Sequence, residues 1–247
     1  MEGRIKKYFN TVKESFLDAL YPKTCALCGN ILLSKERGIC RECSKTLRLV
    51  EEPRCKKCGK AIRDWQEEFC LDCRKHTHSF VCNRGIFSYN EQMQDAIARW
   101  KFQGRREYSQ FFGDAMYYYG KSYIKHCEAQ VLFSMPIHKD KKKLRGFNQA
   151  EDLAKIIEKY TQIPYLGDFL IRKRNTKAMK DLNANERRVN LRGAFDYLGE
   201  NPGYKRALLI DDIYTTGSSL DEVSKVLKAV GIEEVYTMTL CVGESEK

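Results

Sequence analysis

Eight of the eleven cysteines form four C-x-x-C pairs, a spacing that suits metal binding. The pairs begin fifteen residues apart, and they are Cys25/Cys28, Cys40/Cys43, Cys55/Cys58 and Cys70/Cys73. A C-x-x-C pair lets two thiolates of one turn reach the same ion, and zinc takes tetrahedral thiolate sets. In a reducing cytosol such pairs are metal ligands or redox groups far more often than structural disulfides.

A finer repeat of thirty residues shows how the pairs combine. Gly29 follows the first pair and Gly59 the third, and Ile39 and Phe69 precede the second and fourth pairs. This favours two sequential C-x2-C-x11-C-x2-C units over an interleaved arrangement. We predict two four-cysteine zinc sites, which are structural because four ligands leave no open position. Rubredoxin-like iron and dithiol redox chemistry are the alternatives.

The remaining histidines and cysteines near this pattern are not needed as ligands. His76 and His78 follow the last pair, and we expect them to be surface residues because each unit already has four cysteines. Cys82, Cys127 and Cys241 have no partner at this spacing, which favours small buried apolar residues.

A second group of residues with chemical potential lies in one strand-to-helix turn. The apolar run 207–210 leads into adjacent acids, Asp211 and Asp212, and then into a hydroxyl-rich turn, 214–219. The residues of this turn are Tyr214, Thr215, Thr216, Gly217, Ser218 and Ser219. Backbone N–H groups and the helix dipole at such a turn favour a phosphate, whereas the acids suit the hydroxyls of a sugar. The pattern therefore predicts a ribose 5-phosphate site at the end of a sheet strand.

The net charge also points to phosphates. The formal charge is +11, and eight thiolates on two zinc ions would lower it by four to about +7. Two basic stretches stand out, and they are 138–145 and 172–192. Each could face pyrophosphate, solvent or nucleic acid, and a mobile lid is a further alternative for the second stretch. Charge alone does not choose between nucleotides and nucleic acids.

The distribution of apolar residues and cysteines divides the chain into three regions, which must position the residues described above. Residues 1–22 hold a short amphipathic helix that we expect to pack on its own protein, the alternative being a membrane surface. Residues 23–82 hold the cysteine units. Residues 83–247 alternate short apolar runs (131–133, 207–210 and 235–240) with helical patterns (150–160 and 220–229), which predicts an α/β domain with a parallel sheet flanked by helices.

The composition narrows the class of protein. Hydrophobic residues make up 43% and charged residues 31%, so a buried core is feasible and global disorder is not expected. A membrane-spanning helix needs about 20 consecutive apolar residues, and no such run is present. We therefore expect a soluble, cytoplasmic protein with no membrane insertion.

The stretch 207–219 resembles the phosphoribosyltransferase signature, in which four apolar residues precede two acids and a Thr-Gly turn. In that family the acids hold the ribose hydroxyls of 5-phosphoribosyl-1-pyrophosphate (PRPP), and the loop binds its 5-phosphate. With the cysteine units and the stretches 139–149 and 182–195, the chain is similar to the ComF family from about residue 16 onward. This family fuses a double zinc ribbon to a type I phosphoribosyltransferase domain.

The resemblance implies roles for individual residues. Asp211 and Asp212 would be the catalytic acids, and magnesium would bridge the pyrophosphate and ribose hydroxyls. The PRPP-binding residues would be His138, Lys139, Tyr214, Thr215, Thr216, Gly217, Ser218 and Ser219. The lid or DNA-contacting residues would be Arg145, Phe147, Arg172 and Arg187. The implied partners are single-stranded DNA entering during natural transformation and a competence helicase.

Two functions therefore remain open. One is a PRPP-binding protein that handles single-stranded DNA in natural competence, with Phe147 and Trp65 as candidate exposed aromatics. The other is a catalytic phosphoribosyltransferase with an unknown acceptor, unrelated to DNA. Thr215 stands where transferases that act on 6-oxopurines carry an aspartate, so such an acceptor is disfavoured. A pure protein-interaction module ranks third.

Overall fold

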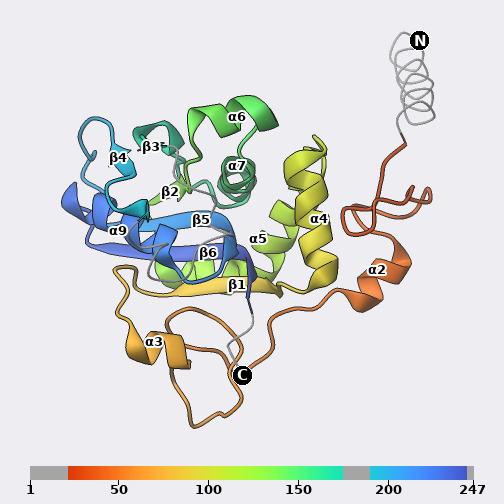
Figure 1. Cartoon of the computed structure of the whole chain (residues 1–247), viewed down its shortest axis with the longest axis horizontal. Helices are drawn as coiled ribbons and strands as arrows, with labels where there is room; N and C mark the ends of the chain where they lie inside the picture. Colours follow the sequence, from red (N-terminus) through yellow and green to blue (C-terminus); the bar gives the residue numbers. More distant parts are fainter. Residues whose placement is uncertain (1–21, 175–189, 244–247) are drawn as a thin grey trace, which may run out of the picture.

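The computed structural model describes residues 22–174 and 190–243. Nearly all of the helix predicted over residues 1–22, and Arg187 with most of the second basic stretch, lie outside this part. In the described part, a parallel sheet of four strands has the order β1-β6-β5-β2 (Figure 1). Its strands are β1 (Asn83–Ser88), β2 (Val131–Ser134), β5 (Arg206–Tyr214) and β6 (Glu234–Val242). The predicted parallel α/β fold is confirmed.

Helices cover both faces of this sheet. They are α4 (Glu91–Phe102), α5 (Tyr108–Cys127), α6 (Lys139–Arg145), α7 (Gln149–Thr161) and α9 (Ser218–Ala229). Alternation along β5 sorts the faces: Leu208 and Ile210 point into the core shared with α4, α5 and α7, whereas Ala207 and Leu209 pack in the core that holds α9. A two-stranded antiparallel sheet, β3 (Leu170–Arg172) with β4 (Phe195–Tyr197), follows the short helix η1 (Gly167–Phe169) and joins the α9 side.

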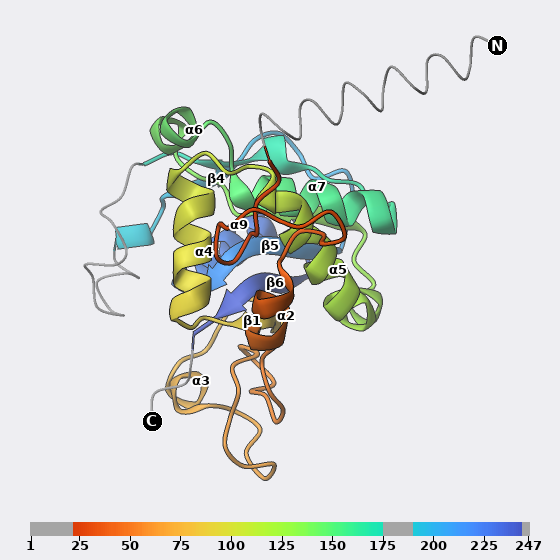
Figure 2. The same ribbon diagram turned by 90° about the vertical axis from the view of Figure 1, so that its right-hand side faces the viewer.

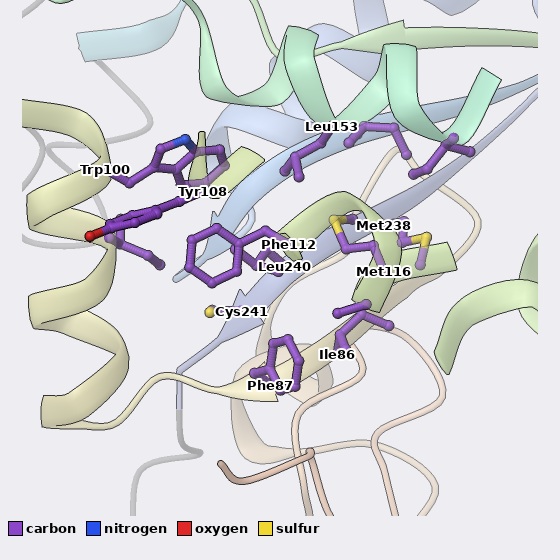
Figure 3. Close-up of a cluster of buried hydrophobic side chains, with 14 of the residues drawn as sticks. Ile86, Phe87, Trp100, Tyr108, Phe112, Met116, Leu153, Met238, Leu240 and Cys241 are labelled. Atoms are coloured by element: carbon purple, nitrogen blue, oxygen red, sulfur yellow. The ribbon is translucent and has the colours of Figure 1, made fainter. Parts of the chain in front are cut away.

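The larger core is aromatic at one end and aliphatic at the other. Trp100 of α4 and Phe112 of α5 lie with their ring centroids 5.0 Å apart, while Leu240 of β6 lies beside Phe112 and Met238 lies next to Met116 (Figure 3). The Trp100 indole donates to Ser109 at 3.0 Å, so its one polar group is satisfied. This packing fixes α4 against the ends of the central strands.

The cysteine-rich region lies along the edge strand β1 and reaches both faces of the sheet. Its helices are α2 (Arg41–Thr46) and α3 (Leu71–Lys75), which both lie near the β1 edge of the sheet in Figure 2. Val50 donates its backbone N–H to Ile86 at 3.0 Å, which continues the sheet edge. Leu27 packs in the α4–α5 core, whereas Ile62 packs in the core that holds α9.

The acid pair lies inside a strand rather than after one. The sequence predicts a strand over 207–210, but β5 continues to Tyr214 because Asp211 and Ile213 are in register with Thr239 and Cys241 of β6. Both acids are therefore held by the sheet. None of the helices in the described residues has the length and apolar character needed to cross a membrane.

Candidate functional site

The eight paired cysteines form two separate metal-ligand sets. The first zinc set is Cys25, Cys28, Cys40 and Cys43, and the second is Cys55, Cys58, Cys70 and Cys73. Within each set the sulfurs all lie within 4.8 Å of one another. Cys28 and Cys40 approach to 3.8 Å between sulfurs, and Cys58 and Cys70 to 3.6 Å. Four thiolates at these separations fit a tetrahedral zinc ion, and each sequential unit brings its own four cysteines together, as predicted.

Glycine and short helices shape both sets in the same way. Gly29 and Gly59 have φ of 79° and 73°, a conformation that other residues rarely adopt. At Gly59 a Cβ would lie 2.5 Å from the carbonyl oxygen of Asn83, so the second set approaches β1 too closely for any side chain. Cys40 and Cys70 are the N-caps of α2 and α3, which carry the last ligand of each set.

The acid pair meets a lysine from a different part of the chain. Lys101, near the end of α4, forms an ion pair with Asp212, and each side chain is only 15% exposed. Asp211 accepts the backbone N–H of Asp212 at 2.8 Å. Burial, followed by the negative charge of Asp212, raises the pKa of Asp211 to about 8, against the opposing effect of Lys101 and Arg172.

Three cations, Lys101, Arg145 and Arg172, interact with this acid pair, and Lys141 lies near these three; we call the four residues the cation arc. Burial lowers the pKa of Arg145 and of Arg172, while Asp212 and Asp211 respectively act in the opposite direction. Burial, and then repulsion from the other three cations, lowers the pKa of Lys141. Cations that repel one another in the absence of a ligand make a site suited to a multiply charged anion.

Aromatic rings hold two members of the cation arc. The Arg145 guanidinium lies 5.0 Å from the Phe102 ring centroid, and the Arg172 guanidinium lies 5.4 Å from that of Phe195. Such stacking restrains a long side chain at little desolvation cost. Lys101 belongs to α4, Arg145 to α6 and Arg172 to β3. Three elements therefore converge on the acids at the end of β5.

The hydroxyl-rich turn 214–219 leads directly into α9. Gly217 has φ of 76° and is the N-cap of α9 without a side-chain capping bond, so the first amides of the helix are left for another acceptor. Thr216 and Ser218 join through their hydroxyls at 2.9 Å. Tyr214 is buried beneath the turn, where a Cβ at Gly217 would lie 2.6 Å from its hydroxyl oxygen. The turn thus depends on glycine.

His138 and Lys139 open α6 beside a cavity of about 460 Å³. His138 is buried and its Nδ1 accepts the backbone N–H of Asp140 at 3.3 Å, so it caps α6, whereas Lys139 is exposed. Arg172 also lines this cavity. The cavity therefore adjoins the acid pair through a member of the cation arc.

Two expectations about exposure are wrong. Phe147 is buried rather than exposed, because it lies in the α4–α5–α7 core with the Arg106 guanidinium 5.7 Å from its ring centroid. His78 is not a surface residue: its side chain is 3% exposed and pairs with Asp221 of α9. His76 is partly exposed, and Trp65 is exposed as expected.

Sequence reasoning missed Lys101. It follows the apolar positions Met93, Ile97 and Trp100, which mark the buried face of α4. Its neighbour in the sequence is therefore a core residue, and this places it at the inner border of the helix. No local pattern connects it to Asp212, which lies more than a hundred residues away.

The chain matches models of two domain families. Residues 16–74 match the double zinc ribbon domain, and residues 144–247 match the phosphoribosyl transferase domain. Together with the two cysteine sets and the parallel sheet, these matches define a zinc-ribbon protein with a phosphoribosyltransferase-type domain.

Similar whole proteins identify the family. Competence protein F of Haemophilus influenzae is 30% identical over 161 residues, which span 63% of this chain and 70% of that protein. Competence protein ComFC of Streptococcus pneumoniae is 34% identical over 164 residues, 65% of this chain and 68% of that protein. The chain belongs to the ComF family. DNA utilization protein YhgH of Escherichia coli O157:H7 is 29% identical over 110 residues, 44% of this chain and 48% of that protein.

Proposed function

We propose that this protein binds PRPP with magnesium at the end of β5 and handles single-stranded DNA in natural competence. The observation that carries the first half is the acid pair Asp211/Asp212, held in register by β6 and followed at once by the uncapped start of α9. A ligand with ribose hydroxyls and a 5-phosphate matches this order of acids and amides.

Different groups of residues bind the different parts of the ligand. The acids accept hydrogen bonds from the ribose hydroxyls, and the turn 214–219 takes the 5-phosphate on its amides and hydroxyls, with Tyr214 supporting it from beneath. The cation arc, with His138 and Lys139 at the neighbouring cavity, faces the pyrophosphate. Bound magnesium would supply positive charge between pyrophosphate and ribose hydroxyls.

The proposed handling of single-stranded DNA is supported by the names of similar proteins and by one surface of the structure. Proteins named for competence and DNA utilization match this chain. Where α4 meets α6, Phe102 is 69% exposed and Leu144 84% exposed, beside Arg145 and the exposed Lys143. Aromatic rings among cations are typical of single-strand binding, because bases stack on the ring while cations hold the phosphates. We place the DNA at this α4–α6 surface, in the cytoplasm and beside a competence helicase.

Calorimetric titration with PRPP, with and without Mg²⁺, tests the ligand. We expect saturable binding that is strengthened by Mg²⁺, and no heat of binding with either mixture would contradict the proposal. Titration of a labelled single-stranded oligonucleotide at two salt concentrations tests the partner. Affinity should fall as salt rises, because neutralised phosphates release counterions. An affinity independent of salt would contradict phosphate-driven binding.

The catalytic alternative has a separate observation in its favour. The cation arc lies beside the acid pair at the end of β5, and its positive charge could stabilise a leaving pyrophosphate. A transferase would release pyrophosphate from PRPP only when an acceptor is present. Screening nucleobases and amines for acceptor-dependent pyrophosphate release distinguishes this alternative from binding alone.

A further inference from the structure

The segment after the second zinc set makes a direct contact with the helix that begins at the hydroxyl-rich turn. The Nδ1–H of His78 donates to one carboxylate oxygen of Asp221 at 3.0 Å, and the backbone N–H of Ser79 donates to the other at 2.6 Å. The side chains of His78 and Asp221 are 3% and 14% exposed. Both oxygens of this carboxylate are therefore engaged in a nearly buried contact.

His78 also supports the turn itself. A Cβ at Gly217 would lie 3.1 Å from Cε1 of His78, so the imidazole packs directly against the glycine. The imidazole stacks on Phe80 with centroids 4.8 Å apart, and Phe80 meets Tyr214 edge-on at 6.3 Å. Three rings thus form a continuous layer from the cysteine-rich region to the underside of the turn.

Asp221 has an electrostatic effect on the same place. It belongs to the first turn of α9, and its backbone N–H donates to Gly217 at 2.8 Å. A free carboxylate there would compete for the amides that face a phosphate, and its negative charge would repel the phosphate. The two donors from His78 and Ser79 direct the carboxylate away from those amides.

We propose that His78 is a positioning residue for the 5-phosphate of the ligand. It holds Gly217 from beneath and engages the Asp221 carboxylate, so that the amides of α9 remain available to phosphate. Through His78 the second zinc set and the turn 214–219 act as one unit, whereas the pyrophosphate end of the site does not depend on it. This inference rests on the proposed PRPP site.

The test compares two partial ligands, ribose 5-phosphate and pyrophosphate, by calorimetry. His78→Phe keeps the ring stacked on Phe80 but removes the donor, and we expect binding of ribose 5-phosphate to weaken about fivefold. Binding of pyrophosphate should stay unchanged. His78→Asn places an amide donor near the position of Nδ1 and should restore binding, and His76→Phe is the matched control outside the contact.

A double variant separates the electrostatic role from a merely structural one. His78→Phe with Asp221→Asn removes the uncompensated negative charge, and affinity for ribose 5-phosphate should recover. Equal loss of both ligands in His78→Phe, or no recovery in the double variant, would overturn the inference. If His78→Phe does not fold, two other double variants test the inference. His78→Ala/Asp221→Asn should bind ribose 5-phosphate as tightly as the wild type, and His78→Gln/Asp221→Glu should bind it more weakly. Weaker binding by the first variant than by the second would contradict the inference. Wild-type protein that binds neither ligand refutes the proposed function and this inference together.

Discussion

Lys101 of α4 forms an ion pair with Asp212 of β5, and both side chains are largely shielded from solvent. This contact connects the first zinc set to the acid pair. The side chain of Gln92, at the start of α4, donates to the Cys43 sulfur at 3.6 Å, and Arg99 donates to the backbone oxygen of Leu27. Together with the His78–Asp221 contact, the two zinc sets support the two ends of the acid-and-turn segment from opposite faces of the sheet.

Removing the charge of Lys101 should weaken ligand binding in a pH-dependent way. Without the ammonium, Asp211 loses a cation that favours its charged form, so its pKa rises further and it resists ionisation. We expect Lys101→Met to bind PRPP–Mg²⁺ about tenfold more weakly at pH 7, with partial recovery at higher pH. Lys101→Arg should stay close to wild type, and Lys125→Met on the exposed face of α5 is the control. Tighter binding by Lys101→Met would show instead that the lysine competes with the ligand.

The raised pKa of Asp211 makes the stability of the free protein depend on pH. Its pKa is about 8 when folded against an ordinary 3.8, so the folded state holds a proton that the unfolded state releases. The free energy of unfolding should therefore decrease as pH rises from about 4 to about 8. Urea unfolding of wild type and Asp211→Asn at several pH values measures this. The variant should show a flatter profile, and identical profiles would contradict the raised pKa.

Ligand binding should follow the opposite trend over the upper part of this range. PRPP–Mg²⁺ favours ionised Asp211, so affinity should increase as pH approaches the pKa of about 8. Calorimetry between pH 6.5 and 8.5 checks this, with Asp211→Asn as the variant that lacks the titrating group. Wild-type affinity that falls over this interval would count against an ionised Asp211 in the complex.

Zinc removal should unfold the cysteine-rich region and release the turn. The wild type should hold about two zinc ions per chain, because each set supplies four thiolates. Cys28→Ser and Cys58→Ser should each retain about one ion, and both should unfold at lower temperature. Metal content by emission spectrometry and melting temperature measure these effects. Because the segment that follows the second set contacts the turn through His78, Cys58→Ser should lose more affinity for ribose 5-phosphate than Cys28→Ser.

Truncation of Phe102 should weaken DNA binding more than PRPP binding, which it affects only through the restraint of Arg145. The exposed ring supplies a stacking surface, and stacking contributes about 1–3 kcal/mol per base. We expect Phe102→Ala to weaken binding of a single-stranded oligonucleotide at least about fivefold. Fluorescence anisotropy measures it, and Trp65→Ala, at an exposed aromatic in the cysteine-rich region, is the comparison. A larger loss in Trp65→Ala would place the DNA on that region instead.

The sequence predicts those parts of the site that are local in the chain. The cysteine sets follow from one spacing rule, and the acids with their turn lie within thirteen residues, so their contacts are set by a single strand and helix. Lys101 and His78 join the site only because α4 and the end of the cysteine-rich region pack against β5 and α9. Phe147 shows the converse, since an aromatic that closely follows a basic stretch is buried by its position before α7.

A thermal-shift titration with PRPP and Mg²⁺, comparing wild type with Asp211→Asn/Asp212→Asn, tests the central claim most directly. A ligand that binds only the folded state stabilises it by about 2.7 kcal/mol at a hundredfold excess over Kd. We predict a rise in the melting temperature of the wild type and none in the double variant. An equal rise in both proteins would place the ligand elsewhere, and no rise in either would contradict PRPP binding by this fold.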